Sequence, residues 1–569
     1  MRDTAGGTAL LTDAPSDHAQ APAGPPADHA QAPVDAPADG VRTPVDPLVT
    51  GVAGLCGRGA PDSPALTYKD TTVDYAELRR RVAGTAAGLR RLGVRRGDRV
   101  VVYMEKRVET VVALFAVAAA GGVFVPVNPV YKAPQIRHIV DDCAASAVIT
   151  TDERYATVRA AVAGSPSVTE VVLVGETAGA PAAHDTAGAP EDPWRVTSWH
   201  ALPGDDGGVP PVQVIDTDLA AILYTSGSTG SPKGVVLSHR NLIAGAESVA
   251  GYLGHGPDDV ILAALPLSFD AGFSQITTAL HAGAHVVLAN YLLPVELVRL
   301  CARHRVTGLT GVPPLWIQLT GCRWPAEATA HLRYFANTGG RMPRSTLARL
   351  RELFPAARPY LMYGLTEAFR ATYLDPAEAD RRPDSIGKAI PNADVGVVRP
   401  DGTACEPHEH GEIVQRGALV AQGYWNDPVR SAERFRPAPG ADGTVRAEIA
   451  VWSGDRAYRD EDGFLYFVGR DDEMIKTSGY RVSPTEIEEA AYATGLVSGA
   501  VAFGLPDERL GQIAVLVVAG DTTESDLRKA MEDQVPRYML PKRVVFLDQL
   551  PVSPNGKFDR VETRRTVTA

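Results

Sequence analysis

A glycine- and hydroxyl-rich loop is the strongest chemical signal in the sequence. It reads Tyr224-Thr-Ser-Gly-Ser-Thr-Gly-Ser-Pro-Lys-Gly234 and follows the apolar segment 219–223. Its three glycines let the backbone approach an anion closely, its successive N–H groups can form an anion-binding nest, and Lys233 adds a positive charge. The spacing is not that of a Walker A loop, because two residues separate Gly230 from Lys233. We therefore expect a phosphate-binding loop rather than a flexible Gly/Ser linker, since a linker is not normally preceded by a buried strand.

Alternating strand and helix patterns precede this loop. The sequence predicts strands at 99–103, 123–127 and 147–150, separated by helices at 106–120 and 133–142. Strands and helices that alternate at this spacing indicate right-handed βαβ units and a parallel sheet.

Two smaller units are predicted in the later part of the chain. Short apolar runs between 395 and 470, broken by Asp-Gly pairs at 401 and 462, indicate the hairpins of a small β unit. After 470, helical and strand patterns alternate over about a hundred residues, which is typical of a compact domain. The expected fold class is α/β, with a large N-terminal domain of parallel βαβ sheets plus a small β unit, followed by a small mobile α+β C-terminal domain.

Composition and charge exclude several classes of protein. Of the 569 residues, 45% are hydrophobic and 22% charged, which excludes collagen-like and wholly disordered chains. A formal charge of −12 disfavours nucleic-acid partners. Five cysteines without a C-x-x-C pair predict a reduced, cytoplasmic compartment. The apolar run 111–127 contains Gly-Gly and Pro, so it favours a buried helix and strand over a membrane span.

Six motifs occur in a fixed order along the chain. After the loop come Asn337-Thr-Gly-Gly340, Tyr363-Gly-Leu-Thr-Glu367, Ser453-Gly-Asp455, Gly469-Arg-Asp-Asp-Glu-Met-Ile-Lys-Thr-Ser-Gly-Tyr-Arg481 and Pro554-Asn-Gly-Lys557. Together they resemble the adenylate-forming superfamily of acyl-CoA synthetases, nonribosomal peptide adenylation domains and luciferases. The resemblance runs from about 45 to 560. The domains expected are a disordered Ala/Pro-rich tail at 1–45, a large adenylation domain at 46–470 and a small C-terminal domain at 471–569.

The resemblance implies an ATP-dependent ligase that joins a carboxylate to the α-phosphate of ATP, releases pyrophosphate and passes the acyl group to a thiol. ATP and Mg²⁺ are the expected cofactors. Because the first step brings two anions together, the site must supply positive charge. Lys557 resembles the residue that bridges the carboxylate and the α-phosphate, although turn chemistry alone would favour a solvated lysine. Glu367 resembles the Mg²⁺ ligand, and Thr366 resembles a hydroxyl donor to the α-phosphate.

The same motifs imply the rest of the nucleotide site. Tyr363 would stack on adenine, Asp455 would hold both ribose hydroxyls, and Arg470 would make a further ribose or phosphate contact. Without the resemblance, Asp455 and Arg470 would be interpreted as surface charges. The other residues expected to bind ATP are Thr225, Ser226, Gly227, Ser228, Thr229, Gly230, Lys233, Gly339 and Gly340.

Members of the superfamily rotate the C-terminal domain between the two half-reactions. Asp472 occupies the position of the pivot. Gly479 resembles the glycine of the loop that enters the site for thioester formation, where a side chain would block the pantetheine arm. Lys557 is expected to leave the site as Gly479 enters.

The segment 264–274 bears on the identity of the carboxylate. Fatty and aromatic acyl-CoA synthetases usually present a histidine here, whereas amino-acid adenylation domains carry Phe-Asp, whose carboxylate pairs with the substrate ammonium. Asp270 is therefore expected to bind an amine. Two structural alternatives stay open, in which Asp270 caps a helix that starts at Ala271 or pairs internally with Arg370. The other substrate-binding residues expected are Phe269, Ser274, Thr338 and Arg370.

The expected activity is formation of an acyl-adenylate of an amino acid and its transfer to the phosphopantetheine thiol of a separate carrier protein. The alternative is an AMP-forming acyl-CoA synthetase that acts on a non-amino carboxylic acid with CoA as acceptor. The segment 269–275 resembles prolyl-carrier-type ligases and exosortase-associated acyl ligases equally. A luciferase-type oxidative enzyme is disfavoured by Gly479, and a non-catalytic nucleotide-binding relative would be expected to lack Lys557 or Glu367. Neither a nucleic acid nor a membrane is an expected partner.

Overall fold

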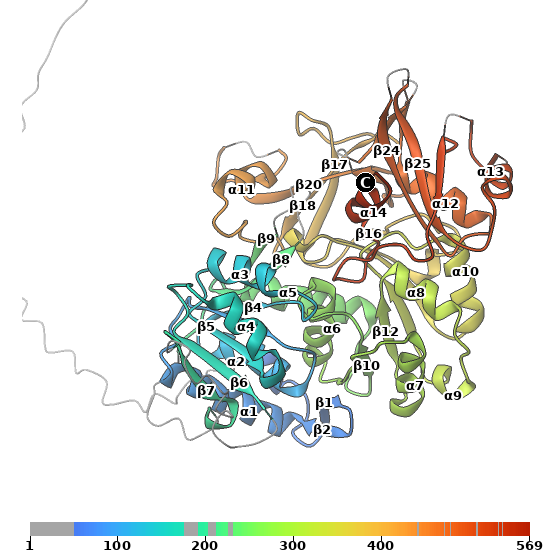
Figure 1. The fold of residues 1–569 in the computed structure, drawn as a ribbon. Helices are drawn as coiled ribbons and strands as arrows, with labels where there is room; N and C mark the ends of the chain where they lie inside the picture. Colours follow the sequence, from blue (N-terminus) through green and yellow to red (C-terminus); the bar gives the residue numbers. More distant parts are fainter. Residues whose placement is uncertain are drawn as a thin grey trace, which may run out of the picture. The chain divides into compact units, whose positions relative to one another are not determined.

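The computed structural model describes residues 51–175, 192–202, 212–225, 232–440, 443–470, 473–477, 480–507, 510–532, 534–537 and 539–568. By its contacts the chain divides into Met1–Val45 and Asp46–Ala569. The tail predicted at 1–45 lies outside the described residues. Every helix and strand named below belongs to the second unit (Figure 1).

The first sheet carries the two ends of the loop predicted to bind phosphate. Among the described residues it has seven strands, which are parallel except for the edge strand β9. Thr225 pairs with Lys233, so the two ends of the loop lie side by side. In spatial order the strands are β7 (Arg195–Ser198), β6 (Glu170–Val174), β5 (Ala147–Thr151), β3 (Arg99–Tyr103), β4 (Val123–Pro126), β8 (Leu219–Thr225) and β9 (Lys233–Ser238).

The second sheet presents two further motifs at one edge. Nine strands of the described chain form it, parallel at the centre and antiparallel at both margins. The motifs at 337–340 and 363–367 follow two neighbouring parallel strands, β13 and β14, so they emerge at the same edge. In spatial order the strands are β16 (Lys388–Ala389), β15 (Thr372–Leu374), β14 (Arg358–Tyr363), β13 (Tyr334–Asn337), β12 (Gly308–Gly311), β10 (Val260–Ala263), β11 (His285–Leu288), β1 (Pro64–Tyr68) and β2 (Thr71–Asp74).

Helices and one large apolar core join these two sheets. The core includes Val100 and Phe124 from the first sheet and Leu66 and Ile261 from the second, together with most of α2. In the part of the chain that the structure describes, no helix is both long enough and apolar enough to cross a membrane. The helices are α1 (Tyr75–Arg91), α2 (Val108–Ala119), α3 (Ala133–Asp142), α4 (Tyr155–Val162), α5 (His239–Leu253), α6 (Asp270–His281), α7 (Pro294–His304), α8 (Pro313–Thr320), α9 (Ala326–Thr329) and α10 (Arg344–Leu353).

A smaller antiparallel sheet follows, as the Asp-Gly pairs predict. The pair at 462 lies in the turn between the antiparallel strands β20 and β21. The elements are β17 (Ala393–Val398), β18 (Gly411–Gly417), α11 (Pro428–Arg434), β19 (Phe435–Pro437), β20 (Ile449–Arg459) and β21 (Leu465–Arg470).

The C-terminal elements, red in Figure 1, form a separate mixed sheet with its own apolar core. This core packs α12 and α13 against β24 and β25. The elements are β22 (Ile475–Thr477), β23 (Tyr480–Val482), α12 (Pro484–Ala493), β24 (Gly499–Asp507), β25 (Gly511–Ala519), α13 (Glu524–Glu532), β26 (Arg543–Phe546) and α14 (Arg560–Thr568).

The predicted fold class is confirmed, with three differences in detail. The sheet margins are antiparallel, because β2, β9, β15 and β16 return to their sheets by short connections rather than crossover helices. Helix α6 begins at Asp270 and not at Ala271. Helix α2 begins at Val108, two residues later than predicted.

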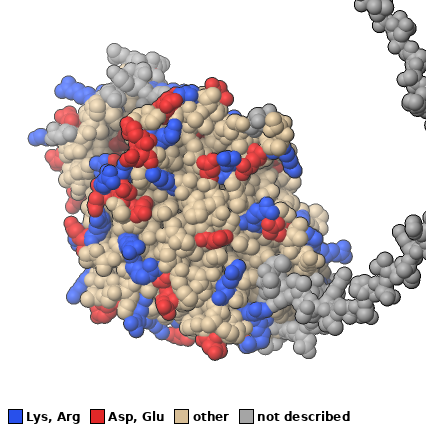
Figure 2. Space-filling view, turned by 180° about the vertical axis from the view of Figure 1, so that it is seen from behind, with Lys and Arg blue, Asp and Glu red and all other residues tan. Residues whose placement is uncertain are grey.

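On the face seen in Figure 2, basic and acidic side chains are interspersed.

Gly272 allows α6 to pack against the turn that follows β10. A methyl group at this position would lie 1.9 Å from the carbonyl oxygen of Pro266. We expect Gly272→Ala to lower the free energy of unfolding by about 1 to 3 kcal/mol, because the backbone must shift to relieve the clash. Thermal unfolding measures the effect. Gly251→Ala in α5 is the matched control, since a methyl group there meets nothing within 4 Å in the described structure. Equal melting temperatures for the two variants would contradict this packing.

Candidate active site

All six motifs contribute to the wall of one cavity of about 310 Å³. This convergence follows from the two sheets, because Thr225 and Lys233 at the edge of the first sheet and the segments 337–340 and 363–367 of the second line the same cavity. The predicted site residues in the wall are Thr225, Lys233, Gly339, Gly340, Tyr363, Thr366, Glu367, Asp455, Arg470 and Lys557.

The other predicted residues fall into two groups. The substrate-binding set is buried, and it meets the cavity where Lys557 Nζ lies 4.7 Å from the centre of the Phe269 ring. This set comprises Phe269, Asp270, Ser274, Thr338 and Arg370. The second group lies outside the described residues and comprises Ser226, Gly227, Ser228, Thr229, Gly230, Asp472 and Gly479.

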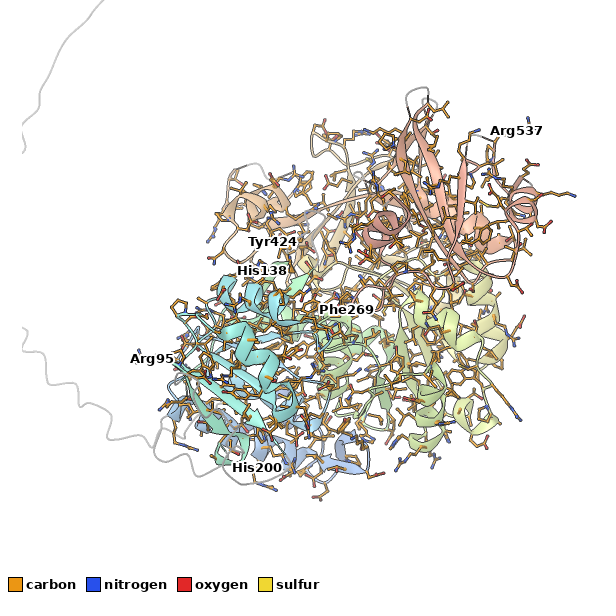
Figure 3. The ribbon with its side chains drawn as sticks, viewed as in Figure 1. Arg95, His138, His200, Phe269, Tyr424 and Arg537 are labelled. Carbon is orange, nitrogen blue, oxygen red and sulfur yellow. The ribbon has the colours of Figure 1, made fainter. Side chains whose placement is uncertain are left out.

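Lys233 and Glu367 form a compact polar cluster with Tyr424, a residue that the motifs did not indicate. Lys233 Nζ donates to Glu367 Oε1 at 2.8 Å and to the Tyr424 hydroxyl at 2.6 Å. The same hydroxyl donates to Glu367 Oε1 at 2.6 Å. Tyr424 reaches the cluster because its segment pairs with β9, where Trp425 N donates to Gly234 O at 2.8 Å. Tyr424 is labelled in Figure 3.

Glu367 remains ionised in this cluster. Burial by itself raises the pKa of its carboxyl group, but Lys233 and the Tyr424 hydroxyl act in the opposite direction and hold the pKa below its usual value. Burial, and then the charge of Glu367, raise the pKa of Tyr424, which therefore keeps its proton and donates. The cluster thus presents a carboxylate and a lysine side chain to the cavity.

Asp455 and Arg470 come together on adjacent strands of the small β unit. They are paired residues of β20 and β21, and Arg470 Nε lies 3.5 Å from Asp455 Oδ1. The Tyr363 hydroxyl donates to Asp455 Oδ2 at 2.6 Å, which fixes the orientation of the carboxylate. Burial raises the pKa of Asp455, although Arg470 and the Tyr363 hydroxyl oppose this shift. Tyr363, Asp455 and Arg470 therefore form one corner of the cavity.

The Lys557 side chain lies close to the backbone of residue 339, and this contact requires a glycine there. A methyl group on Gly339 would lie 2.6 Å from Lys557 Cε, and the φ of Gly339 is +75°. Burial lowers the pKa of Lys557, whereas the negative charge of Asp270 favours the protonated form. The lysine is thus held at the junction of the cavity and the predicted substrate residues.

Asp270 is paired with Arg370, one of the two structural alternatives that the sequence left open. Their Oδ2 and Nη1 atoms lie 3.1 Å apart, and the side chains are 4% and 3% exposed. Asp270 is not a helix cap, because Phe269 occupies that position and α6 starts at Asp270 itself. Asp270 Oδ1 is buried and has no hydrogen-bond partner among the described residues. One carboxylate oxygen, Oδ2, thus accepts a hydrogen bond from Arg370, and the other, Oδ1, accepts none from the described residues.

Lys106 positions the turn that leads to Phe269 and Asp270. Its Nζ donates to the carbonyl oxygens of Ala263, Ala264 and Leu265 at 2.9, 2.7 and 3.0 Å. Burial lowers its pKa to about 7. No sequence pattern indicates this role, because the three acceptors are backbone atoms more than 150 residues away.

Comparison with known proteins identifies the family. A model of AMP-binding enzymes matches residues 56–425, and a model of their C-terminal domain matches residues 486–557. The chain belongs to the AMP-binding enzyme family. It is an AMP-forming acid ligase that uses ATP, as the motifs predict.

Relatives of this AMP-binding enzyme include both carrier-protein ligases and CoA ligases. It is 35% identical to the L-proline–L-prolyl-carrier protein ligase of Streptomyces coelicolor, over 87% of this chain and 92% of that protein. It is 32% identical to feruloyl-CoA synthase of an Amycolatopsis species, over 89% of this chain and 96% of that protein. The crystal structure of ATP-bound MatB from Rhodopseudomonas palustris is similar with a TM-score of 0.77 and 26% identity, covering 91% and 99% of the two chains.

Removing the Tyr424 hydroxyl tests the polar cluster. Tyr424→Phe keeps the ring beneath Lys233 Nζ, which lies 4.2 Å from its centre. We expect ATP–pyrophosphate exchange to slow by about 10²-fold, because the donor that orients Glu367 is lost. The acid limb of the pH–rate profile should move to higher pH, because the hydroxyl helps to lower the pKa of Glu367.

Tyr75→Phe is the matched control for this experiment. It also removes a buried hydroxyl, which donates to Ala284 O at 2.7 Å, but Tyr75 does not line the 310 Å³ cavity. Its exchange rate and pH profile should match those of the wild type. A Tyr424→Phe enzyme with an unshifted acid limb would show that the hydroxyl does not tune Glu367.

Proposed function

We propose that this enzyme activates an amino acid as its adenylate and passes the aminoacyl group to the phosphopantetheine thiol of a separate carrier protein. The observation that carries the proposal is the buried Asp270 Oδ1, which has no partner among the described residues. A buried carboxylate oxygen without a hydrogen-bond partner is costly, and a substrate ammonium would donate to it. The 35% identical prolyl-carrier protein ligase supports this proposal.

Positive charge is what the first half-reaction requires of the protein. A substrate carboxylate oxygen attacks the α-phosphorus of ATP, the bond from that phosphorus to the bridging oxygen breaks, and the electron pair leaves with pyrophosphate. Lys557 would lie between the carboxylate and the α-phosphate, and Thr366 would donate its hydroxyl to the α-phosphate. Groups fixed in place before the reaction stabilise developing charge without reorganisation.

We also propose that Mg²⁺ is the cofactor and that Glu367 is its protein ligand. Mg²⁺ is usually bound by one or two carboxylates together with phosphate oxygens and water. Within the described ranges, no group of three or more His, Cys, Asp or Glu side chains could hold a metal. The ionised carboxylate of Glu367, which lines the cavity, fits this mode of binding. Lys233, which now pairs with Glu367, would then turn to the phosphates.

In the second half-reaction the thiol sulfur attacks the acyl carbon, the bond to the AMP oxygen breaks, AMP leaves and the thiol proton passes to solvent. For this step we propose domains at 46–470 and 471–569, with Asp472 as the pivot and Gly479 at the entry of the pantetheine arm. We further propose a cytoplasmic location, because all five cysteines are free thiols, a state that a reducing compartment maintains.

The second candidate is an acyl-CoA synthetase that acts on a carboxylic acid without an amine. The observation that favours it is the ion pair between Asp270 and Arg370, which already balances the carboxylate without a ligand. The relative named feruloyl-CoA synthase, at 32% identity, supports the same candidate.

ATP–pyrophosphate exchange with amino acids and their desamino analogues separates the two candidates. Our proposal expects exchange to be fastest with an amino acid. Mass spectrometry of CoA and of a phosphopantetheinylated carrier protein, each incubated with the enzyme, ATP and the best acid, then identifies the acceptor. A plain acid preferred to every amino acid, or acylation of CoA while the carrier stays unloaded, would favour the acyl-CoA synthetase.

Asp270→Asn tests the amine directly. We expect the KM for the amino acid to rise by about 10²- to 10³-fold, because breaking a buried ion pair typically costs about 3 to 5 kcal/mol. The KM for ATP should change little. Asp259→Asn is the matched control, since it breaks an ion pair of 2.6 Å with Arg333 away from the cavity. This control should lower the melting temperature and keep both constants. A parallel rise of the two KM values in Asp270→Asn would count against the proposed role.

A further inference from the structure

Asn128 connects the turn after β4 to the turn that carries Lys557. Its Nδ2 donates to the carbonyl oxygen of Pro554 at 2.7 Å, across 426 residues of sequence. Its Oδ1 accepts a hydrogen bond from Val130 N at 3.1 Å, and the residue is 3% exposed. The second contact fixes which way the amide faces, so the donor is held toward Pro554.

The Lys557 turn, which includes Pro554, is closed by backbone hydrogen bonds. Ser553 N donates to Lys557 O at 2.7 Å, and Gly556 N donates to Ser553 O at 2.8 Å. The flanking residues Val552 and Phe558 form a β-bridge. Because this short turn is closed by its own backbone, the position of Pro554 O sets the position of the Lys557 side chain.

Asn128 binds the backbone of this turn and not the lysine. The Lys557 side chain itself contacts Gly339 and the Phe269 ring, which belong to the site. A change at Asn128 therefore removes no predicted catalytic side chain but alters the docking of the turn that carries Lys557.

We propose that Asn128 is a positioning residue that holds the Lys557 turn in place for adenylation. The inference rests on the proposed function, in which Lys557 acts in the first half-reaction and leaves before the second. The hydrogen bond to Pro554 forms while Lys557 is in the site and must break when Lys557 leaves. It consequently favours adenylation and opposes the domain rotation that thioester formation requires.

Asn128→Asp is the most specific variant. The carboxylate keeps the acceptor for Val130 N but loses the donor, and it repels the Pro554 carbonyl oxygen. We expect ATP–pyrophosphate exchange, measured with the acid that the wild type activates fastest, to slow by about 10-fold, as loss of one buried hydrogen bond suggests. Thioester formation from supplied acyl-adenylate should stay at the wild-type rate or rise. Asn128→Ala should also slow exchange without slowing thioester formation, but by a smaller factor.

Asn290→Asp is the matched control. Its Nδ2 donates to Lys106 O at 2.7 Å, and Asn290 lines the same cavity of about 670 Å³ as Asn128 and Pro554. Both of its half-reactions should match those of the wild type. Equal losses in the two half-reactions of Asn128→Asp and Asn128→Ala, or unchanged exchange in both, would overturn the proposal. Wild-type enzyme that exchanges with no acid would instead overturn the proposed function, and the role of Asn128 with it.

Discussion

The active site must bring two anions together, a carboxylate and a phosphate, so its lysine and arginine side chains must stay charged. Burial acts against this, because it disfavours the charged form of an ionisable group. Lys233, Arg370 and Lys557 each have a polar partner that serves this end. The partners are Glu367 and Tyr424 for Lys233, Asp270 for Arg370, and the negative charge of Asp270 for Lys557. Burying an ion without such compensation costs several kcal/mol, so the carboxylates are as necessary to the site as the cations. When substrates bind, phosphate, carboxylate and amine would replace these internal partners.

The two large sheets bring these charges together from distant parts of the chain. The antiparallel pair β8 and β9 places Lys233 beside Thr225, and the parallel pair β13 and β14 places Gly339 beside the segment that carries Glu367. Tyr424 enters through a short segment that pairs with β9. Lys557 is the exception, because it comes from the C-terminal elements. In the proposed function it would enter and leave the site as the half-reactions alternate.

Much of this arrangement could be predicted, because strands, helices and motif residues are encoded locally. The helix 133–142 matches α3 at both ends, and all six motifs reach one cavity. Tyr424, Lys106 and Asn128 could not be found in the same way. Their roles depend on partners 57 to 426 residues distant, and two of them bind backbone atoms that carry no sequence signal. The pairing of Asp270 with Arg370 stayed open for the same reason, since capping is a local property and a buried ion pair is not.

The central claim is that Lys557 acts only in adenylation, where the carboxylate attacks the α-phosphate. Measuring both half-reactions of Lys557→Ala tests this claim most directly. ATP–pyrophosphate exchange reports the first, and thioester formation from supplied acyl-adenylate reports the second. Loss of one fixed electrostatic contact typically slows a reaction by about 10²- to 10³-fold, so exchange should fall by this factor. Thioester formation should proceed at the wild-type rate. Equal slowing of both half-reactions would contradict the role of Lys557 and the alternation built on it.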